Sequence, residues 1–151
     1  MTIIDYMRQK LTEYPKISEF MGGDDIHIDF TDPSPVNYGL SSTGDSLIKE
    51  DMLGNQTRRH NFTLYAVGQS FTDYWRLANS NFLLELGYWL ERLPEERGIE
   101  VEVDGKKLTG KFVGATTANA MAMQPMGETM DNGVLYQLQI SATYKIESEE
   151  F

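Results

Sequence analysis

The strongest pattern of hydrophobic and polar positions lies between Ser70 and Leu93 and predicts a long helix. Ser70 supplies an N-cap hydroxyl, Asp73 stands at the capping-box position, and Pro94 follows the last helical residue. The apolar stripe is wide, so we expect one continuous helix that packs against a sheet or against neighbouring subunits. The residues that recur at spacings of three and four are Phe71, Trp75, Ala78, Phe82, Leu86, Trp89 and Leu93.

A shorter helix is predicted at the N-terminus. Thr2 and Asp5 have the spacing of a capping box, and Pro15 directly follows the helical pattern. The opposite face is charged, so we expect only one face of this helix to contact the core. The residues on the apolar face are Ile3, Met7, Leu11 and Tyr14.

Alternating apolar and polar residues predict strands between the two helices. Residues 26–30 and 59–67 alternate in this way, and residues 36–40 resume an extended conformation after two prolines. Residues 41–55 are mostly polar with two glycines, which indicates an excursion or a long hairpin arm. The apolar residues available to anchor this arm are Leu47, Ile48, Met52 and Leu53.

Further strands are predicted after the long helix. Residues 99–103 alternate apolar and acidic side chains, and the pair Asp104-Gly105 favours a two-residue hairpin turn into a return strand. Residues 134–146 alternate over their whole length, which predicts a long, half-buried strand. The chain therefore has the order helix, strands, helix, hairpin and closing strand. This order predicts an α+β fold with a mixed, mainly antiparallel sheet packed on one face by both helices.

Residues 114–133 have no steady strand or helix period. Small residues come first, followed by methionines that are flexible and polarisable and can adapt to a partner surface. A free monomer would gain little by exposing them. We therefore interpret the segment as a mobile loop that makes an assembly contact rather than as core filler. Its methionines are Met121, Met123, Met126 and Met130.

Composition limits the classes of function. The length and apolar content are those of a single domain over residues 1–151. The net charge of -10 disfavours non-specific attraction to nucleic acid or to an anionic membrane. The absence of cysteine excludes disulfides, thiol catalysis and thiolate metal sites. No signal peptide or membrane span is recognisable, so we expect a location in the cytoplasm.

No group of residues predicts catalysis or cofactor binding. The two histidines, His27 and His60, fall on predicted strands with outward or edge-like placement. The acidic pair at residues 24–25 lacks the spaced ligands of a calcium loop. Gly110 and Gly114 do not form a phosphate-binding loop and are interpreted as strand glycines that allow a bulge or a close backbone approach. We expect no catalytic residue, no metal and no cofactor.

Two other clusters have both a functional and a structural interpretation. Arg58, Arg59 and His60 form a basic cluster that can bind phosphate or an acidic partner, although a solvated strand edge is the more common role. Trp75, Trp89 and Tyr88 can line an aromatic pocket for a small molecule, although aromatic residues at helical spacing are more often core.

The chain resembles a group of prophage proteins encoded among the tail genes of Gram-positive bacteria. The resemblance covers nearly the whole chain and is carried by MTIIDYMRQKLTEYPKISEF, LANSNFLLELGYWLERLPE and GVLYQLQISATYKIESEEF. Proteins of this group look like phage tail terminators, also called tail completion or minor capsid proteins. They are α+β subunits that form a ring, commonly hexameric, which caps the tail tube and joins the tail to the head.

The resemblance implies a structural virion protein without enzymatic activity. Its partners would be other copies of itself in a hexameric ring, the tail tube protein and the head–tail connector, and DNA would pass through the ring without being bound specifically. It would be found in the host cytoplasm during assembly and then in the virion tail. The residues proposed for the assembly interface are Met121, Met123, Met126, Met130, Arg58 and Arg59.

Some sequences of this group have been labelled chloramphenicol resistance proteins. Acetyl transfer to chloramphenicol depends on an active-site histidine in an HHxxxDG context, which neither His27 nor His60 has. The alternative to a ring subunit is a small-molecule enzyme or ligand-binding module with an aromatic pocket near Trp75 and Trp89.

Overall fold

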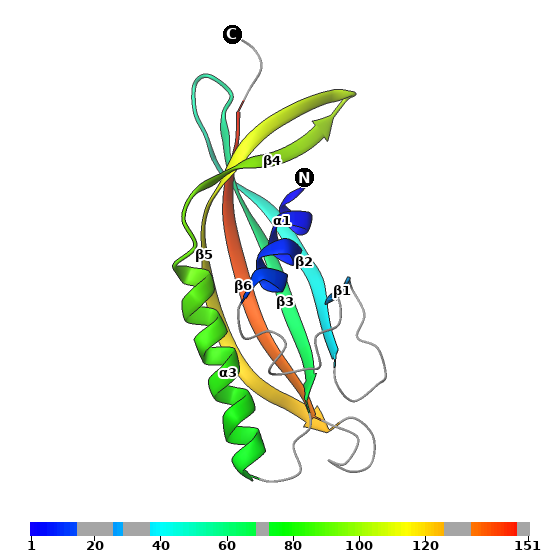
Figure 1. Ribbon diagram of the computed structural model, residues 1–151. Coiled ribbons are helices and arrows are strands. Elements are labelled where there is room, and N and C mark those ends of the chain that lie inside the picture. Colours follow the sequence, from blue (N-terminus) through cyan, green and yellow to red (C-terminus); the bar gives the residue numbers. More distant parts are fainter. Residues whose placement is uncertain (15–25, 29–36, 69–72, 126–133, 148–151) are drawn as a thin grey trace.

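The computed structural model describes residues 1–14, 26–28, 37–68, 73–125 and 134–147. Within them, two helices lie on one face of a six-stranded sheet with the order β1-β2-β3-β6-β5-β4 (Figure 1). Each neighbouring pair is antiparallel except β1 and β2, so the predicted α+β fold with a mixed, mainly antiparallel sheet is confirmed. The strands are β1 Ile26–Ile28, β2 Asn37–Glu50, β3 Gln56–Gly68, β4 Glu96–Val103, β5 Lys106–Pro125 and β6 Val134–Ile146.

The N-terminal helix α1, Ile3–Glu13, begins with the predicted capping box. The Thr2 hydroxyl accepts a hydrogen bond from the Asp5 amide at 3.2 Å, and the Asp5 carboxylate accepts one from the Thr2 amide at 3.2 Å. The buried face joins the helix to the rest of the core. Its Tyr6 ring lies 4.7 Å from that of Phe112 in β5.

The long helix α3, Asp73–Glu91, is continuous, as predicted. The predicted cap residue Ser70 lies outside the described residues, as does Phe71. Side chains are described from residue 81 onwards, and among them Phe82 and Leu86 are buried, which confirms the predicted core face. Gly87 lets the helix approach β5 closely, because a Cβ added there would lie 2.7 Å from the Thr117 hydroxyl.

The core lies between the two helices and one face of the sheet. Tyr14 connects the helices, with its ring 5.8 Å from Phe82 and 5.1 Å from Trp89. The closing strand β6 has the predicted bounds and lies in the interior of the sheet, between β3 and β5. Its buried residues alternate as predicted: Tyr136, Leu138, Ile140, Ala142, Tyr144 and Ile146.

Strand β5 corrects the prediction for residues 114–133. The strand continues to Pro125 and pairs with β6, so residues 114–125 are not a loop. Irregularities in the pairing interrupt the alternation of faces, for example between Phe112 and Gly114 and between Ala118 and Met121. A period-two pattern is lost wherever one strand carries extra residues. The rest of the predicted loop, residues 126–133, lies outside the described residues.

The predicted arm at residues 41–55 is a long hairpin formed by β2 and β3, and it projects from the end of the sheet (Figure 1). Asp51 closes its turn by accepting hydrogen bonds from the amides of Leu53 and Asn55, at 2.9 and 3.0 Å. The prediction that four apolar residues anchor the arm is wrong, because the hairpin extends beyond the helices that would cover them. The exposed side chains are Leu47, Ile48, Met52 and Leu53.

The predicted two-residue turn joins β4 to β5. Asp104 and Gly105 have positive φ angles of 52° and 77°, as a turn of this type requires. Farther along β5, Gly110 lies opposite Ile146, and a Cβ added to it would overlap the carbonyl oxygen of Lys145. This confirms Gly110 as a glycine required by a close backbone approach.

Candidate functional site

A row of basic side chains crosses the sheet. Cross-strand pairing places neighbouring members directly opposite one another on consecutive strands, so the row runs perpendicular to the strand direction. Adjacent strands lie about 4.8 Å apart, so five strands span about 19 Å. In strand order from β2 to β4, the row contains Lys49, Thr57, Lys145, Lys111 and Arg97. We call its four basic residues the cation row.

The cation row lies on the face of the sheet opposite the helices. Lys145 stands between Tyr144 and Ile146, both of which are buried in the core. Successive side chains of a strand point to opposite faces, so Lys145 points away from the core. Directly paired residues share a face, so the other members of the row point the same way.

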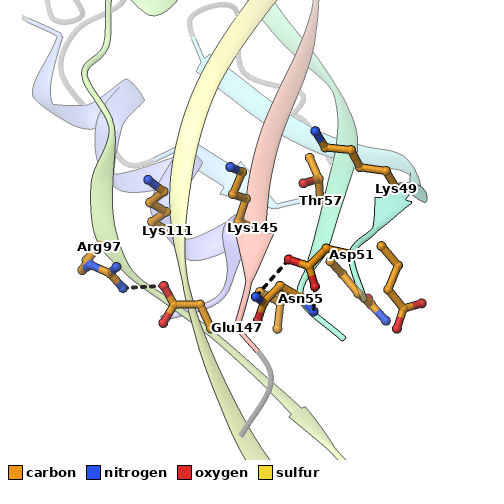
Figure 2. Close-up of a pocket in the computed structure, with 11 residues that line it drawn as sticks. Lys49, Asp51, Asn55, Thr57, Arg97, Lys111, Lys145 and Glu147 are labelled. Atoms are coloured by element: carbon orange, nitrogen blue, oxygen red, sulfur yellow. Dashed lines mark hydrogen bonds and ion pairs between the residues drawn. The ribbon is translucent and has the colours of Figure 1, made fainter. Parts of the chain in front are cut away.

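The row lines a concave surface, and the pocket that this surface forms has a volume of about 410 Å³ (Figure 2). Figure 2 shows Lys49, Lys145 and Lys111 along the sheet, while Arg97 reaches toward Glu147 at the end of β6. The remaining lining residues come from the β2–β3 hairpin and from the end of β6: Glu50, Asp51, Asn55, Gln56, Ile146 and Glu147.

Carboxylates neutralise only part of the cation row. Lys111 forms an ion pair with Glu95 at 3.0 Å, and Arg97 forms one with Glu147 at 2.9 Å. Lys49 and Lys145 have no ion pair or side-chain hydrogen bond among the described residues. Like charges on directly opposite residues destabilise a sheet, and Lys145 and Lys111 are such a pair. The row can therefore bind an anion that supplies the missing negative charge.

A second polar cluster surrounds Asp45 on the helix side of the sheet. Its carboxylate accepts a hydrogen bond from Arg58 Nε at 2.7 Å and one from the Tyr144 hydroxyl at 2.6 Å. The same carboxylate lies 2.9 Å from His60 Nδ1. On the other side of the ring, His60 Nε2 lies 2.9 Å from the Ser42 hydroxyl. These contacts join β2, β3 and β6.

The hydrogen bonds keep Asp45 ionised. Burial raises the pKa of the Asp45 carboxyl, but hydrogen bonds from Tyr144, Arg58 and His60 outweigh it and leave the pKa below its usual value. Burial raises the pKa of the Tyr144 hydroxyl, and its hydrogen bond to Asp45 raises it further. The cluster therefore contains an ionised carboxylate and a neutral phenol that donates to it.

Ser42, His60 and Asp45 are connected in the order of a nucleophile, a base and an orienting carboxylate. Acyl transfer also needs a cavity that holds the substrate beside the nucleophile. Three cavities in the described part of the chain, of about 410, 280 and 160 Å³, are lined by other residues. The contacts of the cluster form a polar cross-link between strands β2, β3 and β6.

Replacing Asp45 by Asn is expected to lower the free energy of unfolding by about 2 kcal/mol, because hydrogen bonds to a charged group are lost and His60 is nearly buried. The folded-state pKa of Asp45 is lowered, so its contribution is complete above about pH 4 and falls as the pH drops through that pKa. The difference between wild type and variant should therefore shrink in acid. Urea unfolding from neutral to acidic pH measures it.

Glu102→Gln is the control for Asp45→Asn, because it removes one exposed carboxyl from β4. Equal losses of stability in the two variants would contradict a specific role for the Asp45 cluster. A loss for Asp45→Asn that does not change with pH would contradict the lowered pKa.

The sequence-based placement of the basic cluster is wrong for two of its residues. His60 was expected at an outward or edge position, but it is 9% exposed and its ring lies 4.5 Å from that of Phe62. Strand β3 lies between β2 and β6 and is not an edge. Arg58 points to the same side and binds Asp45. Arg59 is exposed on the opposite face, about 7 Å along the strand from Thr57 in the row.

Of the predicted assembly residues, only Arg58 and Arg59 have described side chains. Arg58 and Arg59 point to opposite faces of the sheet. Met121 and Met123 belong to β5, where the backbone but not these side chains is described, and Met126 and Met130 lie outside the described residues. The predicted contact between these methionines and a partner stays a prediction.

The aromatic pocket of the alternative function stays a prediction. Trp89 packs against Tyr14 at the core. The side chain of Trp75 lies outside the described part of the structure. A cavity between α3 and β5 has about 160 Å³ and is lined by Tyr88 but not by Trp89. Sites for small molecules usually have about 300 Å³ or more.

Sequence reasoning missed the cation row. Its members are separated along the chain, and only the register of four strand pairs brings them side by side. The available signal was a lysine on the polar face of each of two predicted strands, Lys111 and Lys145. Such residues are usually solvated and do not by themselves indicate a site.

Other indications of function are few. Among the described residues, no group of three or more His, Asp or Glu residues could hold a metal ion. The described helices include none that is long and apolar enough to cross a membrane. No protein-family model matches the chain, and a search of curated proteins found no match.

Proposed function

We propose that the protein is a structural subunit of a phage tail terminator, which forms a ring that caps the tail tube and joins the tail to the head. The proposal starts from the resemblance of three segments of the sequence to such proteins. The structural observation that carries it is the projecting β2–β3 hairpin with its exposed apolar side chains (Figure 1).

Exposed apolar side chains at the end of a projecting hairpin favour contact with another protein. Leu47, Ile48, Met52 and Leu53 gain nothing from contact with water, and full burial of one such side chain contributes about 1.5–3 kcal/mol. A hairpin that extends beyond its own core can place them on a neighbouring subunit. Repeated around an axis, such a contact is heterologous and closes into a ring.

The sheet also has backbone groups available for such a contact. Among the described residues, β1 covers the outer edge of β2 only at residues 38–40, whereas Met1 occupies the outer edge of β4 at Gly98 and Glu100. Among the described residues, the outer edge of residues 41–50 is therefore unpaired. Exposed strand edges readily pair with another chain. In the proposed ring, hexameric as the resemblance implies, the remaining contacts are with the tail tube protein and the head–tail connector.

The experiment is native mass spectrometry of the purified chain over a range of concentrations, with electron microscopy of the chain mixed with purified tail tubes. We expect ring-sized oligomers or caps on the tubes. Leu53→Asp should reduce both, because it places a charge in the proposed contact. Leu84→Asp is the matched control, since Leu84 is an exposed leucine on α3. A strict monomer that also fails to join tail tubes would overturn the proposed function.

A further inference from the structure

Two cations of the cation row line the same concave surface without an ion-pair partner among the described residues. The chain has a net charge of -10, so acidic residues are abundant. Lys49 and Lys145 nevertheless have no carboxylate partner among the described residues, although Lys111 and Arg97 in the same row do. They line one concave surface and point to the same side of the sheet (Figure 2). Lys49 and Lys145 can therefore contact an additional anionic group at this surface.

We propose that the cation row binds the acidic segment at residues 148–151 of a second copy of this chain. The segment reads Ser-Glu-Glu-Phe and contains two carboxylates and no basic residue. Glu149 and Glu150 would supply negative charge to Lys145 and Lys49 of the neighbour. The interaction is an electrostatic contact between subunits and involves no covalent step.

The composition of the concave surface favours carboxylates over the phosphates of nucleic acid. Two cations of the row already bind carboxylates, from Glu95 and Glu147, at 3.0 and 2.9 Å. Glu50, Asp51 and Glu147 also line the surface, so a long chain of anionic groups would meet more repulsion here than a segment with two carboxylates.

The charge of the whole chain favours a second copy as the source of the segment. Each copy is strongly acidic, so a contact between copies needs a local region of opposite charge. The two unpaired lysines of the cation row, Lys49 and Lys145, supply positive charge at the same end of the sheet as the projecting β2–β3 hairpin (Figure 1). The inference rests on the proposed ring function, because it names a contact between neighbouring subunits.

A peptide assay tests the row directly. A fluorescent peptide with the sequence of residues 147–151 is titrated with the full chain, and binding is followed by anisotropy. We expect Lys145→Glu to weaken binding by about tenfold or more and added salt to weaken binding to the wild type. Lys106→Glu is the matched control, because it makes the same charge change at an exposed position outside the row. Equal peptide binding by wild type and Lys145→Glu would overturn the inference.

A charge exchange tests the contact between copies. Lys145→Glu alone should assemble poorly, and so should a chain with Glu149→Lys and Glu150→Lys, because each brings like charges together. Mixed in equal amounts, the two chains present opposite charges at every contact, so native mass spectrometry should show restored assembly. Thermal unfolding of each variant checks that both are folded.

The outcomes separate this inference from the proposed function. If the wild type forms rings and both variants do so equally well, the contact proposed here is wrong and the ring function stands. Peptide binding without any effect of the variants on assembly would also overturn it, by indicating that the segment binds within its own chain. Binding of a short DNA duplex that is lost in Lys145→Glu would reassign the row to nucleic acid. A wild type that never assembles would overturn the ring function, whatever the peptide result.

Discussion

Replacing Leu86 by Ala is expected to lower the free energy of unfolding by about 2–5 kcal/mol. Leu86 is 0% exposed and lies on the face of α3 that contacts the sheet, beside the buried Phe82. Truncation removes buried methyl groups and leaves a cavity that the surrounding residues fill only partly. Urea unfolding followed by circular dichroism measures the loss, and Phe82→Ala should behave in the same way.

The control is Leu84→Ala on the same helix. Leu84 is 47% exposed, so this change should alter stability by about 0.5 kcal/mol or less. The comparison holds residue type and helix constant and changes only the side of the helix. Near-equal losses for Leu86→Ala and Leu84→Ala would mean that the packed face of α3 is assigned incorrectly.

Replacing Gly110 by Ala is expected to cost about 3 kcal/mol, because the added methyl group would overlap the backbone carbonyl of Lys145 in the neighbouring strand. A flexible side chain could move aside, but a carbonyl in a sheet moves only if the strand pairing shifts. For a protein of this size the melting temperature should fall by about 6–12 °C. Thermal unfolding checks this value.

Gly114→Ala provides the comparison, since no atom lies within 4 Å of a Cβ added there. Both glycines belong to β5, so the two changes are equal in their effect on the unfolded chain. Gly114→Ala should therefore be close to neutral. If Gly110→Ala were equally tolerated, β5 and β6 would not approach as closely as described.

The two proposed contact regions can be tested separately. Leu53→Asp acts on the apolar end of the β2–β3 hairpin, whereas Lys145→Glu acts on the open face of the sheet. Both positions are exposed, so neither change removes core contacts. A loss of assembly in either variant therefore reports on the surface that carries the changed residue.

The sequence alone determined the features that depend on neighbours along the chain. The Thr2 capping box, the turn at Asp104-Gly105 and the alternation of residues 134–146 are local patterns, and each was confirmed. The core face of the long helix also followed from spacing, since Phe82 and Leu86 are buried. Local hydrogen bonds and the periods of helix and strand suffice for such predictions.

Only the tertiary structure decided the features that depend on strand order and register. His60 is buried because β3 lies inside the sheet, and residues 114–125 form a strand although their bulges remove the period. The cation row exists because residues from Lys49 to Lys145 meet through a succession of strand pairs. A shift of one residue in any of these pairs would turn a basic side chain to the other face, and no local pattern encodes that register.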